Sequence, residues 1–230
     1  MAFTLDTQTR NIVYFIKIMK QTLHPDDGIR NLLQRLDMAL NKPEARIITF
    51  ISARAGEGTS TIARDYVRAL ADEVDHEILL IDAGRLDDSF YSENNATPET
   101  TLTETVAAGQ PLTDALYPLA EHVKFGRWSR EGGRSRNAVS KLLNDDAFWE
   151  NLHNSFGTVV IDAPSLQASS DGIALAVHAD ATVLVVEAET TRQPVIEHLR
   201  DTLSSAGAQI LGVVMNKRHF YIPAKVYQNM

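Results

Sequence analysis

The residues with the clearest chemical potential lie in a short glycine-containing segment, ARAGEGTST, at Ala53–Thr61. A run of β-branched and aromatic residues precedes it at Arg46–Ser52, and a helical stretch follows from Thr59 to about Val74. A strand, a glycine loop and a helix in this order are typical of a phosphate-binding loop, because glycines let backbone N–H groups turn inward around phosphates. The helix N-terminus adds partial positive charge. We therefore predict a phosphate site, with the Ser60 hydroxyl placed to bind Mg²⁺.

This loop lacks the lysine of a standard P-loop. Such a loop ends Gly-Lys-Ser/Thr, whereas this one ends Gly58-Thr59-Ser60. The missing ammonium group normally reaches the β- and γ-phosphates and holds charge during phosphoryl transfer, and threonine cannot supply that charge. Taken alone, the segment also fits a plain strand-to-helix turn. A dinucleotide-binding fingerprint fits poorly, because Thr61 stands where the third glycine belongs.

Two aspartates strengthen the prediction of a nucleotide site. Asp82 ends the apolar run Glu77–Asp82, and Asp162 ends the run Gly157–Asp162. The carboxyl ends of parallel strands meet at one edge of a sheet, where ligands bind. Either aspartate alone could cap a helix, but two carboxylates beside a phosphate loop are what Mg²⁺ coordination requires. We predict both as metal-binding residues, and as catalytic residues if the protein is active.

The elements that must position these residues alternate along the chain. Continuous apolar runs predict strands buried on both faces, and helical stretches lie between them. This alternation predicts an α/β fold, with a mostly parallel buried sheet flanked by helices. The predicted strands are 46–52, 77–82, 157–162, 181–187 and 209–215, with a weaker one at 121–125, and further helices are expected near 139–153 and 194–206.

The N-terminal part has a different pattern. Apolar residues recur at helical spacing over Asn11–Lys20 and again over Gly28–Leu40. After Pro43 the pattern changes to the α/β type. We therefore predict an N-terminal helical segment over residues 1–43 and one globular P-loop domain over residues 44–230.

Two inserts are predicted as loops, at Asn94–Thr101 and Arg127–Arg136. The second lies in the segment GRWSREGGRSR, which carries four arginines and one glutamate. A solvated loop is the simpler interpretation, and a contact with an anion or a partner is the alternative.

Composition narrows the class of protein. The 230 residues carry 22 basic and 30 acidic side chains, a formal net charge of −8, which argues against a nucleic-acid partner. The absence of cysteine excludes disulfides, thiolate metal sites and cysteine nucleophiles. The apolar stretch Ile12–Met19 is far shorter than the ~20 residues that span a bilayer. We expect a cytoplasmic protein that reaches the inner face of the membrane through a partner.

Several motifs occur together in a recognisable order. SARAGEGTST from Ser52 is similar to S-x-x-P-G-E-G-K-S-T, and ILLIDAGRLDDS from Ile78 is similar to a Walker A′ segment. FGTVVIDAPSL from Phe156 is similar to a Walker B strand, and AGAQILGVVMNKRHFYIP from Ala206 to the end of the same fold. Over roughly Asp27–Tyr227 the sequence thus resembles the cytoplasmic domain of bacterial tyrosine kinases (BY-kinases) of capsular and exopolysaccharide synthesis. These kinases belong to the MinD/ParA branch of P-loop NTPases.

The resemblance implies a set of functional residues and ligands. The cofactor would be ATP or ADP with Mg²⁺, and the partner a membrane polysaccharide co-polymerase or export protein, with homo-oligomers expected. Asn216 would read adenine, although a strand-end turn is its plainer interpretation, and Arg54 stands where relatives place a lysine that reaches across a dimer. Tyr221 and Tyr227 would be phosphoacceptors or simple packing residues. The implied nucleotide-binding residues are Arg54, Ala55, Gly56, Glu57, Gly58, Thr59, Ser60, Thr61 and Asn216, with Ser60, Asp82 and Asp162 on the metal.

The sequence also departs from the family pattern. Thr59 replaces the P-loop lysine, Gly84 the second Walker A′ aspartate, and Ser165 the second proline of Walker B. The oligomerisation motif E-x-x-R-x-x-R is reduced to Asp27-x-x-Arg30-x-x-Leu33. These losses favour a degenerate or weakly active nucleotide-binding regulator of the membrane co-polymerase. An active tyrosine autokinase is the first alternative, and a ParA/MinD-like positioning ATPase the second.

Overall fold

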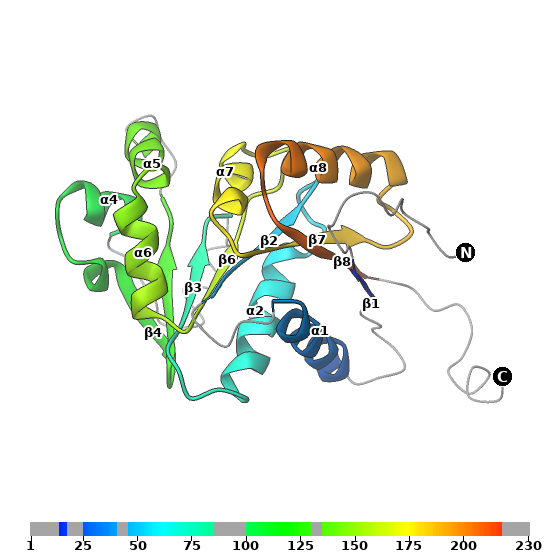
Figure 1. The fold of residues 1–230 in the computed structure, drawn as a ribbon, viewed down its shortest axis with the longest axis horizontal. Coiled ribbons are helices and arrows are strands. Elements are labelled where there is room, and N and C mark those ends of the chain that lie inside the picture. The colour runs from blue at the N-terminus through cyan, green and yellow to red at the C-terminus, as the bar shows by residue number, and fades with distance from the viewer. Residues whose placement is uncertain (1–13, 18–24, 41–45, 85–99, 130–134, 218–230) are drawn as a thin grey trace.

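The protein is built around one sheet of eight strands, as seen in a computed structural model that describes residues 14–17, 25–40, 46–84, 100–129 and 135–217 (Figure 1). The strand order is β1-β8-β7-β2-β6-β3-β5-β4. All neighbours run parallel except β4 and β5, which pair antiparallel. The strands are β1 Tyr14–Lys17, β2 Arg46–Ser52, β3 Ile78–Asp82, β4 Leu116–Ala120, β5 Val123–Arg127, β6 Thr158–Asp162, β7 Ala181–Glu187 and β8 Ile210–Asn216.

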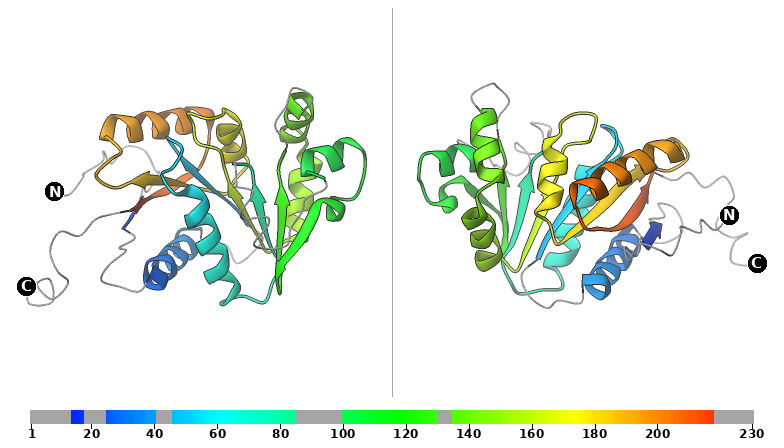
Figure 2. Two further views of the ribbon diagram at one scale, coloured as in Figure 1. Left: turned by 180° about the vertical axis from the view of Figure 1, so that it is seen from behind. Right: turned by 45° about the horizontal axis from the view of Figure 1, so that its top comes forward.

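Helices cover both faces of this sheet (Figures 1 and 2). Two of them, α1 (Pro25–Leu40) and α2 (Thr59–Ala71), pack together on one face. The other face carries α5, α6, α7 and α8. The remaining bounds are α4 Leu102–Ala107, a 3₁₀ turn η1 Leu112–Ala115, α5 Ser135–Leu143, α6 Asp146–Ser155, α7 Asp171–Val177 and α8 Gln193–Ala206.

The central strands are buried on both faces, as predicted from their continuous apolar runs. All seven residues of β2 are buried, and so are all five of β3 and of β6. Side chains of a strand alternate between the faces. Ile47 and Ile51 therefore pack with α5–α8, whereas Ile48 and Phe50 pack with α1 and α2. The predicted α/β architecture with a mostly parallel sheet is confirmed.

The helix predicted over Asn11–Lys20 is wrong where the structure describes it. Residues Tyr14–Lys17 form strand β1, which pairs with β8 from Tyr14 opposite Gly212 to Lys17 opposite Met215. Strand β8 would otherwise present a row of unpaired backbone groups, and pairing satisfies them. A tertiary contact nearly 200 residues away in sequence thus overrides the local helical pattern. The second predicted helix, Gly28–Leu40, lies within α1.

Two further differences concern residues around the α5–α6 region. The helix expected near 139–153 is two helices, because α5 ends at Leu143 and Asp145 caps the start of α6 by accepting from the backbone N–H groups of Ala147 and Phe148. The predicted solvated loop at 127–136 is wrong at its start. Arg127 belongs to β5, and Trp128 is only 1% exposed and stacks on Trp149 at 6.1 Å between ring centroids.

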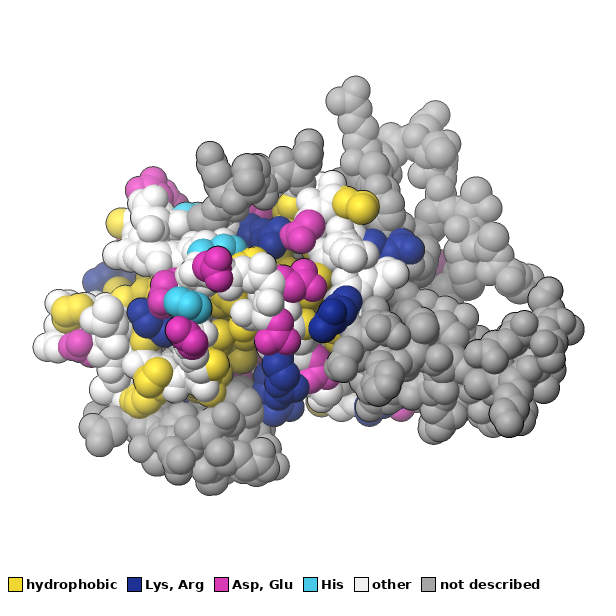
Figure 3. Space-filling model, turned by 90° about the horizontal axis from the view of Figure 1, so that it is seen from below, with side chains coloured by type: hydrophobic (Ala, Val, Ile, Leu, Met, Phe, Trp, Pro, Cys, Tyr) yellow, Lys and Arg dark blue, Asp and Glu magenta, His cyan; other side chains and the backbone are white. Residues whose placement is uncertain are grey.

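The end of the sheet where the parallel strands begin carries mixed charge (Figure 3). Lys124 pairs with Glu77 at 3.0 Å, and His122 lies 3.8 Å from the same carboxylate. Acidic, basic and histidine side chains are interspersed on this face. In the described part of the chain, no helix is long and apolar enough to span a membrane.

The division of the chain at residue 43 stays a prediction, and α1 offers a test of it. Leu33 is fully buried in the core that α1 shares with α2 and the sheet, whereas Met38 on the same helix is 79% exposed. We expect Leu33→Ala to lower the free energy of unfolding by about 2–5 kcal/mol in urea titrations, and Met38→Ala by less than about 0.5 kcal/mol. An unchanged main transition in Leu33→Ala would mean that α1 unfolds apart from the sheet.

Candidate nucleotide-binding site

The predicted phosphate loop joins β2 to α2 as a tight turn. Gly56 and Gly58 adopt φ angles of +86° and +96°, a left-handed conformation that glycine tolerates best. Gly58 is the N-cap residue of α2, and its carbonyl accepts a hydrogen bond from Ile62 N at 3.0 Å. The helix therefore starts directly at the loop and directs its N-terminal end at the ligand position.

Donors from outside the loop hold its carbonyl groups. The Ser52 hydroxyl donates to Arg54 O at 2.9 Å, and Asn216 Nδ2 donates to Glu57 O at 3.0 Å. The Lys217 ammonium donates to Gly56 O. In a trans peptide the carbonyl and the following N–H point in opposite directions. Holding these carbonyls thus favours turning the next N–H groups to the opposite side, as in loops that bind anions.

Glu57 anchors the loop to a second segment. Its carboxylate is 3% exposed and accepts hydrogen bonds from Arg54 N at 2.9 Å and from the Thr191 hydroxyl. Thr191 belongs to the connection between β7 and α8. Asn216, at the end of β8, also accepts a hydrogen bond from Lys217 N through its side-chain oxygen Oδ1, at 2.8 Å. Both side chains therefore lie behind the loop and fix its shape.

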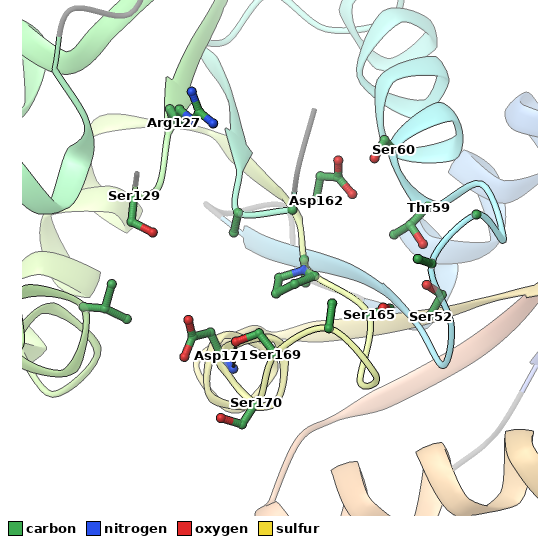
Figure 4. Close-up of a pocket in the computed structure, with 18 of the residues that line it drawn as sticks. Ser52, Thr59, Ser60, Arg127, Ser129, Asp162, Ser165, Ser169, Ser170 and Asp171 are labelled. Atoms are coloured by element: carbon green, nitrogen blue, oxygen red, sulfur yellow. Dashed lines mark hydrogen bonds between the residues drawn. The ribbon is translucent and has the colours of Figure 1, made fainter. Parts of the chain in front are cut away.

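A cavity of about 1400 Å³ opens in front of the loop, at the carboxyl ends of β2, β6, β3 and β5 (Figure 4). Its far wall is formed by the end of β5, by α5, and by the segment from Pro164 to Asp171. Four of the predicted site residues do not line it, namely Arg54, Glu57, Asp82 and Asn216. The predicted residues that line it are Ala55, Gly56, Gly58, Thr59, Ser60, Thr61 and Asp162.

The two predicted carboxylates are neighbours. Asp82 and Asp162 are register partners on β3 and β6, and they are 0% and 2% exposed. Burial raises the pKa of Asp162 to about 7, and the charge of Asp82 adds to this effect, while the Ser60 hydroxyl and Arg64 act in the opposite direction. Neither carboxylate oxygen of Asp162 completes a hydrogen bond within the described residues.

These features fit a magnesium ion. A buried carboxylate whose oxygens lack protein donors is stabilised by a cation, and Mg²⁺ prefers oxygen ligands. Asp162 and the Ser60 hydroxyl face the same cavity from β6 and from the first turn of α2 (Figure 4). They would hold the ion together with phosphate oxygens and water.

The cation and the metal ligand that the family pattern includes are absent from their positions. Thr59 lines the cavity, and its hydroxyl is buried without a hydrogen-bond partner in the described residues. A Cβ atom on Gly84 would lie 3.7 Å from Asp162 Oδ2 and 3.8 Å from Asp82 Oδ1. A carboxylate at position 84 would therefore face both aspartates, and this chain places none there.

Sequence reasoning missed several residues of this site. Arg64 donates through Nε to Ser60 O at 3.0 Å, and Arg127 lines the cavity. Thr191 and Lys217 hold the loop from behind. Two of these residues could have been suspected from the sequence. Lys217 directly follows Asn216, and Arg127 belongs to the arginine-rich insert. Tyr221 and Tyr227 lie outside the described residues.

A P-loop follows β2 in a mostly parallel sheet, and aspartates end the neighbouring strand β6 and the next strand β3, which is the arrangement of a P-loop NTPase domain. Residues 45–206 match the family model described as cellulose biosynthesis protein BcsQ, and the chain belongs to this family. The fold is also that of BY-kinase domains. The kinase domain of Escherichia coli ETK superposes with a TM-score of 0.72 at 19% identity, over 86% of this chain and 79% of that one. MinD of Pyrococcus horikoshii, solved with Mg-ADP, superposes with a TM-score of 0.62 at 20% identity, over 80% of this chain and 76% of that one.

Curated relatives are a succinoglycan biosynthesis transport protein and several tyrosine-protein kinases. The succinoglycan biosynthesis transport protein ExoP of Rhizobium meliloti is 30% identical over 195 residues, which are 83% of this chain. The tyrosine-protein kinase CpsD of Streptococcus agalactiae is 25% identical over 80% of either chain. The chain spans about a quarter of the length of ExoP, and likewise of the kinase ptk of Acinetobacter johnsonii. The predicted resemblance to BY-kinases within the MinD/ParA superfamily is confirmed.

The two loop glycines should respond differently to a methyl group. An added Cβ on Gly56 meets nothing within 4 Å, whereas on Gly58 it overlaps the Asn216 amide. We expect Gly56→Ala to cost about 1–2 kcal/mol of unfolding free energy from backbone strain, and Gly58→Ala to cost clearly more. The additional loss of unfolding free energy in Gly58→Ala should vanish when Asn216 is also replaced by alanine. Equal costs in urea unfolding would show that Asn216 does not support the loop.

Stability should fall as pH rises from about 4 to 7 because of Asp162. Its pKa of about 7 in the folded state exceeds the ordinary value, so the folded protein binds more protons in this window than the unfolded chain. Without Mg²⁺, Asp162→Asn should therefore be more stable than the native protein at pH 8, by roughly 2–4 kcal/mol, and about equally stable at pH 4.5. Chemical denaturation at both pH values measures this. Asp201→Asn, on the exposed side of α8, is the control, and a pH-independent difference for Asp162→Asn would contradict the assignment.

Proposed function

We propose that this protein is a nucleotide-binding regulator of exopolysaccharide or capsule biosynthesis or export, with weak affinity for ADP or ATP with Mg²⁺ and little phosphoryl transfer. The proposal rests on one observation, which is that this site keeps some of the groups that bind a nucleotide and lacks others. The backbone cradle, Ser60 and the buried Asp162 are in place, whereas Thr59 and Gly84 stand where a cation and a metal ligand are needed. This arrangement favours binding over chemistry.

The physical reason is that binding and transfer depend on the missing charge to different degrees. One charge-assisted hydrogen bond contributes about 1.5–3 kcal/mol, so losing the lysine lowers affinity by roughly one to two decades. The remaining amide groups and a metal ion at Asp162 still attract phosphates. Transfer passes through a state with more charge to stabilise at the terminal phosphate, and it depends more strongly on the absent groups.

The partner would be a membrane co-polymerase or export protein. One relative is named as a succinoglycan biosynthesis transport protein and others as tyrosine-protein kinases, which supports this context. Recruitment by such a partner would bring the chain to the inner face of the membrane. A homo-oligomer is also proposed, because Arg54 is exposed beside the loop and can reach a second copy. In that arrangement Arg54 would supply the cation that Thr59 does not.

Calorimetric titration with ADP and with a non-hydrolysable ATP analogue, each with Mg²⁺, tests the proposal. We expect weak binding by the native protein, and about 10- to 100-fold tighter binding by Thr59→Lys. Thr113→Lys, which adds the same charge on the exposed 3₁₀ turn η1, should leave affinity unchanged. Asp162→Asn should lose the dependence on Mg²⁺.

Three outcomes contradict the proposal. No binding by the native protein would exclude a nucleotide-responsive regulator. Native affinity equal to that of Thr59→Lys would show that the missing lysine is irrelevant. Rapid incorporation of labelled phosphate into Tyr221 or Tyr227 would instead establish an active autokinase, which is the alternative function.

A further inference from the structure

We propose that Arg127 recognises the terminal phosphate of a nucleoside triphosphate from the wall of the cavity opposite the P-loop, and that it lets this site distinguish ATP from ADP. The inference rests on the proposed function, since it requires a nucleotide in the cavity. It assigns a role to the first arginine of the arginine-rich insert.

The backbone around Arg127 is held rigidly at the edge of the cavity. Arg127 is the last residue of β5 and the register partner of Asp82. The next residue, Trp128, donates its N–H to Asp82 O at 2.7 Å and accepts from Thr103 N at 3.1 Å. Its ring is buried among Phe148 and Trp149. A side chain on such a support is held in place for recognition better than one on a surface loop.

Arg127 lines the same cavity as the phosphate loop. In Figure 4, Arg127 lies at the end of β5 on one side of the cavity, while Asp162 and Ser60 lie on the other side with the Asp162 carboxylate directed toward Ser60. Among the described residues that line the cavity, Arg127 is the one with a basic side chain. Its planar guanidinium suits phosphate oxygens, which it can bind through two hydrogen bonds at once.

Strand spacing decides which phosphate Arg127 can meet. Neighbouring strands lie about 4.8 Å apart, so β5 is about 10 Å from β6, which ends in Asp162, and about 14 Å from β2, which leads into the P-loop. A long arginine side chain can cover most of the first distance but not the second. Arg127 therefore reaches the region in front of Asp162, where a terminal phosphate would share the metal, and not the inner phosphates cradled by the loop.

Among the described residues, Gly84 places no side chain between these groups. Strand β3 lies between β5 and β6, and Gly84 follows its end, bonded through its N–H to Asp162 O at 2.9 Å. A carboxylate at position 84 would face Asp82 and Asp162 and would compete with a phosphate for Arg127. Because position 84 carries no acid and Arg127 is basic, the outer end of the cavity is more favourable for negative charge.

A simpler role is that Arg127 only balances the buried charge of Asp82 beside it. The two roles differ in what they do to nucleotides. A charge-balancing arginine affects the whole cleft, so its loss weakens ADP and ATP binding together. An arginine that reads the terminal phosphate affects only the triphosphate.

The experiment compares Kd values for Mg-ADP and for a non-hydrolysable Mg-ATP analogue in native protein, Arg127→Gln and Arg127→Lys. We expect the native protein to prefer the triphosphate, and Arg127→Gln to lose about 10- to 100-fold for the analogue while its ADP affinity stays within about twofold. Arg127→Lys should keep part of the preference, since it retains charge without the fork of donors. Arg68→Gln, an exposed arginine on α2, removes the same charge elsewhere and should change neither value.

The outcomes separate this inference from the proposed function. Native protein that binds both nucleotides, with Arg127→Gln weakening both equally or neither, would overturn only the inference. Native protein that binds neither would contradict the proposed function. The same pair of titrations would then be run in a Thr59→Lys background, where binding without any effect of Arg127→Gln on the triphosphate would overturn the inference as well. Circular dichroism of each variant confirms that the fold is intact.

Discussion

The arrangement at the carboxyl end of the sheet depends on one constraint, which is that Asp162 is buried beside a second carboxylate. A charge in that position is costly unless a proton or a cation compensates it. Asp82 lies beside it on β3 and adds repulsion, while Ser60 and Arg64 supply partial compensation from α2. This compensation is incomplete, because the pKa of Asp162 stays raised despite it. The site is therefore prepared for a positively charged ligand at this point.

The phosphate loop obeys a different constraint, because its shape is determined mainly by residues outside it. Asn216 and Lys217 reach the loop carbonyls from the end of β8, and Glu57 connects the loop to Thr191 before α8. These contacts join β2 to β7 and β8 at the same end of the sheet. The loop thus helps to hold these strands together at the carboxyl end of the sheet. Having Thr59 where the family pattern has a lysine removes charge from the cavity without disturbing any of these contacts.

The sequence was sufficient for those parts of the fold that depend on local pattern. Buried parallel strands read as continuous apolar runs, and the strand–glycine–helix order placed the loop correctly between β2 and α2. It failed where a distant contact decides the structure. Residues 14–17 look helical alone but pair with β8, and Asn216 and Lys217 meet the loop some 160 residues earlier in the chain. Arg127 was assigned to a solvated loop because composition cannot show that Trp128 is buried.

These two constraints differ in what they say about function. The glycine loop with its anchors would remain useful to the fold even if no nucleotide ever bound, so its presence alone is weak evidence for activity. Asp162 is the opposite case. It contributes a buried carboxylate whose charge the fold compensates only in part, and an asparagine or an apolar residue there would avoid the cost of its ionisation. A residue that lowers the stability of the empty protein is best explained by a ligand that restores it, because whatever binds only the folded state stabilises that state. The proposal of a cation and phosphate site therefore rests on Asp162 more than on the glycine loop.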